Sequence, residues 1–179
     1  MEIYAVKING LDHPMGFDFE HLLCSWKVRN NKGKKQTRAK IQVAKDEKMS
    51  EVIWEKEGGL NSLGTVIEFS MKPYTRYYFQ ITVHSDVGEE SKSDVLYFET
   101  AKLEDPWTAK WLGVRGEDTH PEFRKNFSIK KEIKSARLYI CGLGIFETYL
   151  GGKKVGNDLL APFINDYEEH YQYCTYDVT

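Results

Sequence analysis

Acidic residues are the first candidates for chemistry in this chain of 179 residues. General acid–base catalysis of hydrolysis uses two carboxyl groups, one of which has a raised pKa. The candidates are Glu89–Glu90, Asp166 and Glu168–Glu169. Glu168 and Glu169 are direct neighbours in an expected turn, where carboxylates are ordinarily solvated and ionised. We therefore assign no catalytic residue.

Other catalytic and ligand-binding patterns are missing or weak. No serine lies in a Gly-x-Ser-x-Gly motif, and the five histidines are scattered. His170 beside Tyr171 fits either a ligand site or a surface imidazole at the start of a strand. Gly142-x-Gly144 has no helical pattern after it, so it indicates a bend in a strand and not a phosphate-binding loop. The three cysteines are widely spaced without a Cys-x-x-Cys pair, so we expect neither metal nor cofactor.

Aromatic side chains make the best candidate binding surface. A sugar ring binds over an aromatic ring that has polar groups around it. Tyr139 and Tyr149 are predicted on outward faces of strands, and adjacency of those strands would bring them together. Such a surface either binds carbohydrate or docks on another domain, and both interpretations stay open. The six candidates are Trp107, Trp111, Tyr139, Tyr149, Tyr167 and Tyr171.

The elements that position these residues read as strands. Residues 1–101 contain about seven short alternating segments with turns roughly every ten residues, which is typical of a β-sandwich. In the clearest segment Tyr77 is followed by Phe79, Ile81 and Val83 on one face. On an earlier segment Cys24 and Trp26 are predicted to face the core.

A short motif sharpens this prediction. Pro73-Tyr74-Thr75-Arg76-Tyr77 resembles the Pro-x-Thr-x-Tyr start of strand F in fibronectin type III domains, and Asp86–Ser93 resembles their F–G loop. The resemblance implies a tyrosine corner, in which the Tyr77 hydroxyl bonds to the upstream backbone.

The second half continues the alternating pattern. Strands are expected at 110–114, 123–129, 135–141, 146–150 and 171–178. Gly151–Gly152 lies before Lys153–Val155 and predicts a two-residue hairpin. Gly116–Pro121 is expected to be a loop.

Several motifs of this half occur together. The run SARLYICGLGIFETYLGGKKVG, then Pro162-Phe163 and YQYCTYDVT, resembles the first non-catalytic domain of bacterial α-L-rhamnosidases over roughly residues 103–179. That resemblance implies a jelly-roll-like β-sandwich placed before a helical catalytic barrel. We therefore predict an all-β chain with a fibronectin-III/immunoglobulin-like sandwich at 1–101, a linker at 102–106 and the front part of a jelly roll, truncated at its end, at 107–179.

The resemblance also implies a function. The parent enzyme would hydrolyse terminal α-L-rhamnose with acids in its C-terminal helical catalytic domain, and this non-catalytic region would brace that domain and contribute to sugar access. Its expected ligand would be a rhamnoside or plant glycan. One alternative is a stand-alone carbohydrate-binding or adhesive two-domain protein, and another is the sandwich region of a different glycosidase.

Composition limits the remaining partners. The net charge of −2 at pH 7 gives no reason to expect a nucleic-acid partner. No apolar run approaches the ~20 residues of a membrane span, and the first residues lack a secretory signal pattern. We expect a cytoplasmic protein, or a secreted one if a leader has been removed. An incomplete second sandwich should expose sheet edges and apolar faces, which predicts a partly open domain or homo-association.

Overall fold

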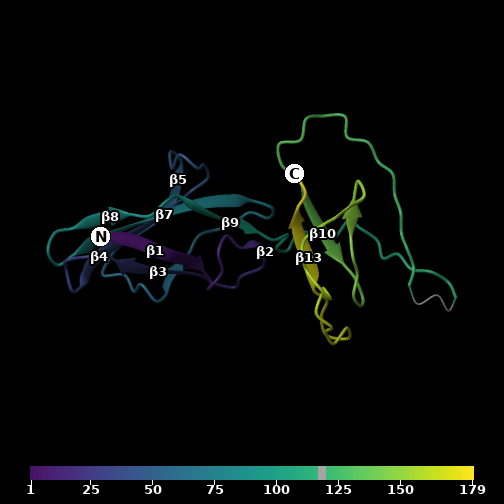
Figure 1. Ribbon diagram of the computed structural model, residues 1–179, viewed down its shortest axis with the longest axis horizontal. Coiled ribbons are helices and arrows are strands. Elements are labelled where there is room, and N and C mark those ends of the chain that lie inside the picture. Colours follow the sequence, from purple (N-terminus) through teal and green to yellow (C-terminus); the bar gives the residue numbers. More distant parts are fainter. Residues whose placement is uncertain (117–119) are drawn as a thin grey trace. The chain divides into compact units, whose positions relative to one another are not determined.

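The computed structural model describes residues 1–116 and 120–179, which form strands, turns and coil without a helix (Figure 1). The predicted all-β class is confirmed. The described chain divides into two compact units, residues 1–104 and 105–179. No helix among the described residues is long and apolar enough to cross a membrane.

The first unit is a sandwich of two sheets that share one core. The smaller sheet has the order β1-β3-β6, with strands β1 (Glu2–Ile8), β3 (Leu22–Arg29) and β6 (Thr65–Ile67). The larger sheet has the order β2-β9-β7-β4-β5, and β8 also pairs with β7. Its strands are β2 (Met15–Phe17), β4 (Gln36–Ala44), β5 (Val52–Gly58), β7 (Arg76–Ser85), β8 (Glu90–Lys92) and β9 (Leu96–Thr100).

The core forms from the alternating residues of both sheets. On β3, Cys24 and Trp26 are 0% and 2% exposed, as their positions in the sequence predict. On β7, Tyr77 and the apolar residues at every second position after it are buried against them. Each fully buried large apolar side chain contributes about 1.5–3 kcal/mol, so this interior holds the unit together.

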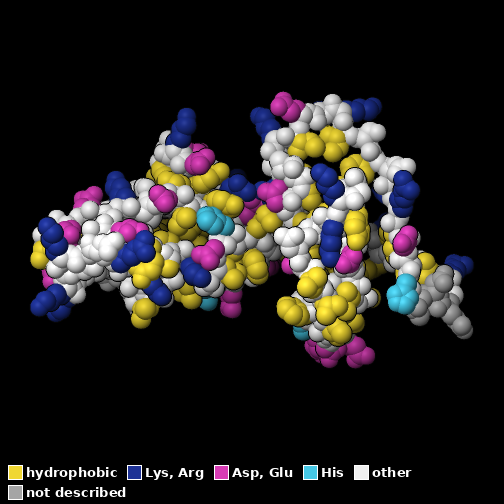
Figure 2. Space-filling view, viewed as in Figure 1, with side chains coloured by type: hydrophobic (Ala, Val, Ile, Leu, Met, Phe, Trp, Pro, Cys, Tyr) yellow, Lys and Arg dark blue, Asp and Glu magenta, His cyan; other side chains and the backbone are white. Residues whose placement is uncertain are grey.

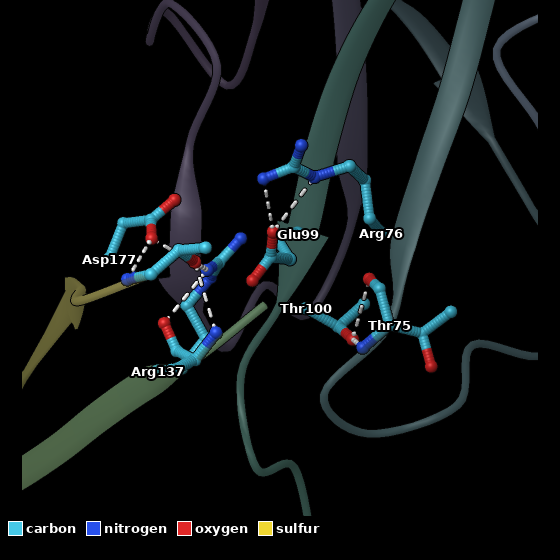
Figure 3. Close-up of polar contacts among 8 residues, drawn as sticks. Thr75, Arg76, Glu99, Thr100, Arg137 and Asp177 are labelled. Carbon is cyan, nitrogen blue, oxygen red and sulfur yellow. Dashed lines mark hydrogen bonds and ion pairs between the residues drawn. The ribbon is translucent and has the colours of Figure 1, made fainter. Parts of the chain in front are cut away.

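A network of hydrogen bonds fixes the start of β7. The backbone N–H of Lys72 donates to the Tyr77 hydroxyl at 2.9 Å, which confirms the predicted tyrosine corner. The Thr100 hydroxyl donates to the Lys72 carbonyl at 2.7 Å. It also accepts the Thr75 N–H at 2.9 Å (Figure 3). Arg76 follows Thr75, and Glu99 precedes Thr100. The Arg76 guanidinium binds the buried Glu99 carboxylate at 2.9 Å. The segment before β7 is thus tied to β9.

The second unit has much less regular structure. Strand β10 (Arg137–Cys141) pairs antiparallel with β13 (Tyr173–Asp177), and β11 (Tyr149–Leu150) pairs with β12 (Lys153–Lys154). Gly151 and Gly152 join the short pair with φ values of 58° and 80°. Positive φ at both positions is what a type I′ turn requires, so the predicted glycine hairpin is confirmed.

Two expected strands of this unit are not formed. Residues 110–114 and 123–129 alternate in sequence but are coil in the structure. Phe123, Phe127 and Ile129 are 55%, 63% and 57% exposed. A strand needs a neighbour that takes its backbone hydrogen bonds, and no neighbouring strand in the described part of the chain does so. The loop expected at 116–121 lies partly outside the described residues.

Burial differs sharply between the units. After Ala101, Pro162 is the only buried residue in the described parts of the chain. Both two-stranded sheets keep an unpaired edge on each strand among the described residues. The open edges and apolar faces predicted for the second half are therefore present.

Candidate functional site

The β10–β13 pair positions the predicted aromatic residues of the second unit. Its register places Tyr139 opposite Thr175 and Cys141 opposite Tyr173. Residues directly opposite each other in an antiparallel pair share a face of the sheet, so Tyr139 and Tyr173 lie on the same face. At the end of this face the Arg137 guanidinium binds the Asp177 carboxylate at 2.8 Å (Figure 3).

Tyr173 is the centre of a first aromatic cluster. The Trp107 ring meets it edge-on, with centroids 5.5 Å apart, and the Tyr139 ring is tilted against it at 6.1 Å. These distances and angles are those of favourable aromatic pairs. Trp107 remains 45% exposed. The structure thus brings together two of the predicted candidates through Tyr173, which the sequence indicated only as a strand residue.

A second aromatic cluster contains three more candidates. Trp111 meets Tyr171 at 5.7 Å, and the rings of Tyr167 and Tyr171 are stacked at 6.4 Å with only 14° between their planes. The Tyr167 hydroxyl accepts the backbone N–H of Gly144 at 2.8 Å, which fixes its ring. Trp111 and Tyr171 are 61% and 55% exposed. This cluster therefore presents aromatic surface to solvent.

Tyr149 lies apart from both clusters. It belongs to the β11–β12 hairpin, which is not hydrogen-bonded to β10 in the described structure, so the strand adjacency that would bring it to Tyr139 is not formed. Its hydroxyl donates to Glu147 at 2.8 Å, and Lys154 binds the other carboxylate oxygen at 2.5 Å. The hydrogen bond from Lys154 holds the pKa of Glu147 below its usual value, and the bond to Glu147 raises the pKa of Tyr149.

The carboxylates considered for catalysis have structural roles or face solvent. The backbone N–H groups of Gly33 and Lys32 donate to Glu89 and lower its pKa, which is the opposite of what a general acid needs. Asp166 accepts the N–H of Glu168 in an exposed turn. No group of three or more metal-ligating side chains occurs among the described residues.

One packed site was not predicted from the sequence. The Tyr176 ring lies against Gly156, where an added Cβ would approach Tyr176 Cε1 at 2.5 Å. Burial, with hydrogen bonds to Cys174 and Asp158, raises the pKa of Tyr176. Gly156 could have indicated a close approach in the sequence. That Tyr176 is the residue packed against it depends on how residues 156–176 fold.

Comparison with known proteins identifies the two halves. Residues 3–104 match the model of the Rha78A-like, N-terminal immunoglobulin domain. The chain belongs to this family. Residues 131–179 match the alpha-L-rhamnosidase N-terminal domain, so a second rhamnosidase-type match follows the Rha78A-like immunoglobulin domain.

Individual relatives of this Rha78A-like chain are also named alpha-L-rhamnosidases. An alpha-L-rhamnosidase of Formosa agariphila is 28% identical over 214 residues, covering 100% of this chain and 22% of the relative. One of Alteromonas sp. is 29% identical over 192 residues, covering 95% of this chain and 21% of the relative. The chain therefore spans about a fifth of the length of these curated relatives.

Solved structures show the same fold. The alpha-L-rhamnosidase from Dictyoglumus thermophilum matches with a TM-score of 0.86 and 28% identity, over 99% of this chain and 23% of that one. The Streptomyces avermitilis enzyme complexed with L-rhamnose matches with a TM-score of 0.58 and 18% identity, over 99% and 20%, which shows fold similarity alone.

Proposed function

We propose that this chain is the non-catalytic N-terminal region of an α-L-rhamnosidase-like glycoside hydrolase, and that its second unit braces the catalytic part of the parent polypeptide. The parent would cleave terminal α-L-rhamnose from glycosides. Support comes from relatives that are named alpha-L-rhamnosidases and that match the chain over about a fifth of their length.

The observation that carries the bracing role is the exposed apolar surface of the second unit. Leu159, Leu160 and Phe163 are 83%, 74% and 81% exposed. Figure 2 shows hydrophobic side chains gathered at one end of this unit, beside a group of acidic side chains. Covering one such side chain is worth about 1.5–3 kcal/mol, so a partner that buries several of them gains substantially. Similarly exposed apolar residues are Leu112, Phe127, Ile129, Leu143, Ile145 and Ile164.

The experiment compares the 179-residue chain with the parent enzyme in hydrolysis of an aryl α-L-rhamnoside. We expect turnover by the parent and none by the chain alone. Activity of the isolated chain would refute the proposed division of labour.

A surface variant tests the bracing role within the parent. Leu160→Asp and Phe163→Asp together should lower its thermal stability and its activity, because charge would replace apolar contact. Val87→Asp is the matched control, since Val87 is 58% exposed in the first unit. Equal behaviour of the double variant and the control would contradict the bracing role.

A second candidate function is carbohydrate binding at the second aromatic cluster. Its support is the solvent exposure of Trp111 and Tyr171, since exposed rings can stack on a sugar face. Titration of the chain with rhamnosides and plant glycans should then saturate, and Trp111→Ala should abolish the signal. Tyr149→Ala is the control because Tyr149 is equally exposed but lies outside the cluster. A titration without saturation would end this candidate.

A further inference from the structure

The first unit contains an open cavity of about 430 Å³. It lies between the smaller sheet and the basic turn that follows β3. A volume of this size is within the ~300–1,000 Å³ of ordinary small-ligand sites. The residues that line it are Met1, Tyr4, Trp26, Lys27, Val28, Asn31, Lys34, Lys35, Gln36, Ser62, Leu63, Val83 and Ser85.

The inner wall of the cavity is held by a fixed hydrogen-bond chain. Trp26 is 2% exposed, and its indole N–H donates to the Gln36 side-chain oxygen at 3.0 Å. The Gln36 amide then donates to the Leu60 carbonyl at 2.7 Å. The backbone N–H of Trp26 donates to the Ser62 carbonyl at 3.0 Å, while no hydrogen bond engages the Ser62 hydroxyl among the described residues. This wall is preformed and has a free hydroxyl to offer a ligand.

The outer wall is cationic. Lys27, Lys34 and Lys35 line the cavity, and no aspartate or glutamate does. None of the three ammonium groups is in an ion pair within the described chain, whereas nearby Arg29 is paired with Glu2. Figure 2 shows several basic side chains, with acidic ones between them, around the end of the first unit that carries the N-terminus. Clustered like charges at a concave site raise the local potential and favour an anion.

The turn that carries two of these lysines is anchored. The N–H groups of Lys32 and Gly33 donate to Glu89 at 3.0 and 3.2 Å, and that of Lys34 donates to Asp86 at 2.9 Å. A Cβ at Gly33 would lie 2.4 Å from an Asp86 carboxylate oxygen, so the turn packs tightly against the β7–β8 loop. One oxygen of the Glu89 carboxylate accepts these backbone N–H groups, and the other lies 3.7 Å from the N-terminal ammonium of Met1, which lines the cavity. Glu89 itself does not line the cavity.

We propose that this cavity binds an anionic saccharide, that is, a sugar unit that carries a carboxylate or sulfate group. The lysines would bind the anionic group, and the Ser62 hydroxyl would bind a hydroxyl of the sugar. The Trp26–Gln36 pair, whose polar groups already bond within the protein, would keep the wall behind the ligand rigid. That the ligand is an anion follows from the three lysines in the lining. That it is a saccharide rests on the proposed function.

The test is an NMR titration of the 179-residue chain with D-glucuronate, D-glucose 6-sulfate, L-rhamnose and sodium sulfate. Saturable shifts of the Trp26 indole and Gln36 amide signals with either charged sugar, and none with L-rhamnose, would support the proposal. Which of the two binds more tightly distinguishes carboxylate from sulfate recognition. Absence of saturation with both charged sugars overturns the proposal, and equal affinity for sodium sulfate overturns its saccharide part.

Charge variants give the matched comparison. Lys34→Gln with Lys35→Gln should weaken binding about tenfold, because each partly exposed ion pair is worth up to about 1 kcal/mol. Lys48→Gln with Lys56→Gln removes the same charge from residues that do not line the cavity and should leave affinity unchanged. Equal losses in both variants would refute a specific site. Rhamnoside hydrolysis by the parent is read separately, so failure here leaves the proposed function intact.

Discussion

Replacing Tyr77 by phenylalanine removes one hydroxyl from the interior of the first unit and leaves the ring in place. Tyr77 is 2% exposed, and its hydroxyl accepts the Lys72 N–H at 2.9 Å. Lys72 is itself an exposed residue, so the lost bond is only partly shielded from water. An intramolecular hydrogen bond contributes a net of about 0.5–1.5 kcal/mol. We expect the free energy of unfolding of this unit to fall by that amount.

Native-state hydrogen exchange of the β7 amides measures this change for the first unit alone. Since every 1.4 kcal/mol is a factor of ten, exchange that occurs through unfolding should accelerate about 2- to 12-fold. Tyr4→Phe is the control, because Tyr4 is 36% exposed and its hydroxyl makes no hydrogen bond within the described chain. Exchange in Tyr77→Phe no faster than in Tyr4→Phe would refute the stabilising role of the tyrosine corner.

Three further predictions concern other parts of the chain. Gly156→Ala should loosen the second unit, seen as lost near-ultraviolet circular dichroism, because φ is +73° there and a Cβ would meet the Tyr176 ring at 2.5 Å; an unchanged spectrum would count against it. Glu89 has a pKa below its usual 4.5, so its stabilisation is present above pH 4.5 and is lost as the pH falls through the folded value. Glu89→Gln should therefore flatten the acid limb of the stability profile, and an unchanged limb would contradict this. Burial raises the pKa of the Cys24 thiol to about 12, so a thiol reagent at pH 8 should label the other two cysteines first, and equal labelling rates would contradict this.

Sequence reasoning succeeded where local pattern and tertiary packing agree. Trp26 and Tyr77 were predicted to face the core because both alternate with polar residues over whole strands, and both are buried. Gly151–Gly152 predicted its turn because positive φ is a local property of glycine.

It failed where a partner distant in sequence decides the outcome. Residues 123–129 alternate well, but no described strand pairs with them. Adjacent strands would have brought Tyr139 and Tyr149 together, yet their strands pair with different partners. Tyr173 was not selected, although Trp107 and Tyr139 both pack on it, because strand register is not visible in composition or spacing. The aromatic clusters therefore depend on strand pairing that the alternation alone does not determine.

The concentration of buried residues before position 102 has a consequence for degradation. Proteases cut segments that open locally, and coil without buried side chains opens at little cost. A brief digestion should trim the chain from its C-terminal side and leave a resistant immunoglobulin-like remnant that ends near Glu104. The same 105–179 segment would gain protection when other protein covers it, so its cleavage rate would report on the bracing contact proposed above.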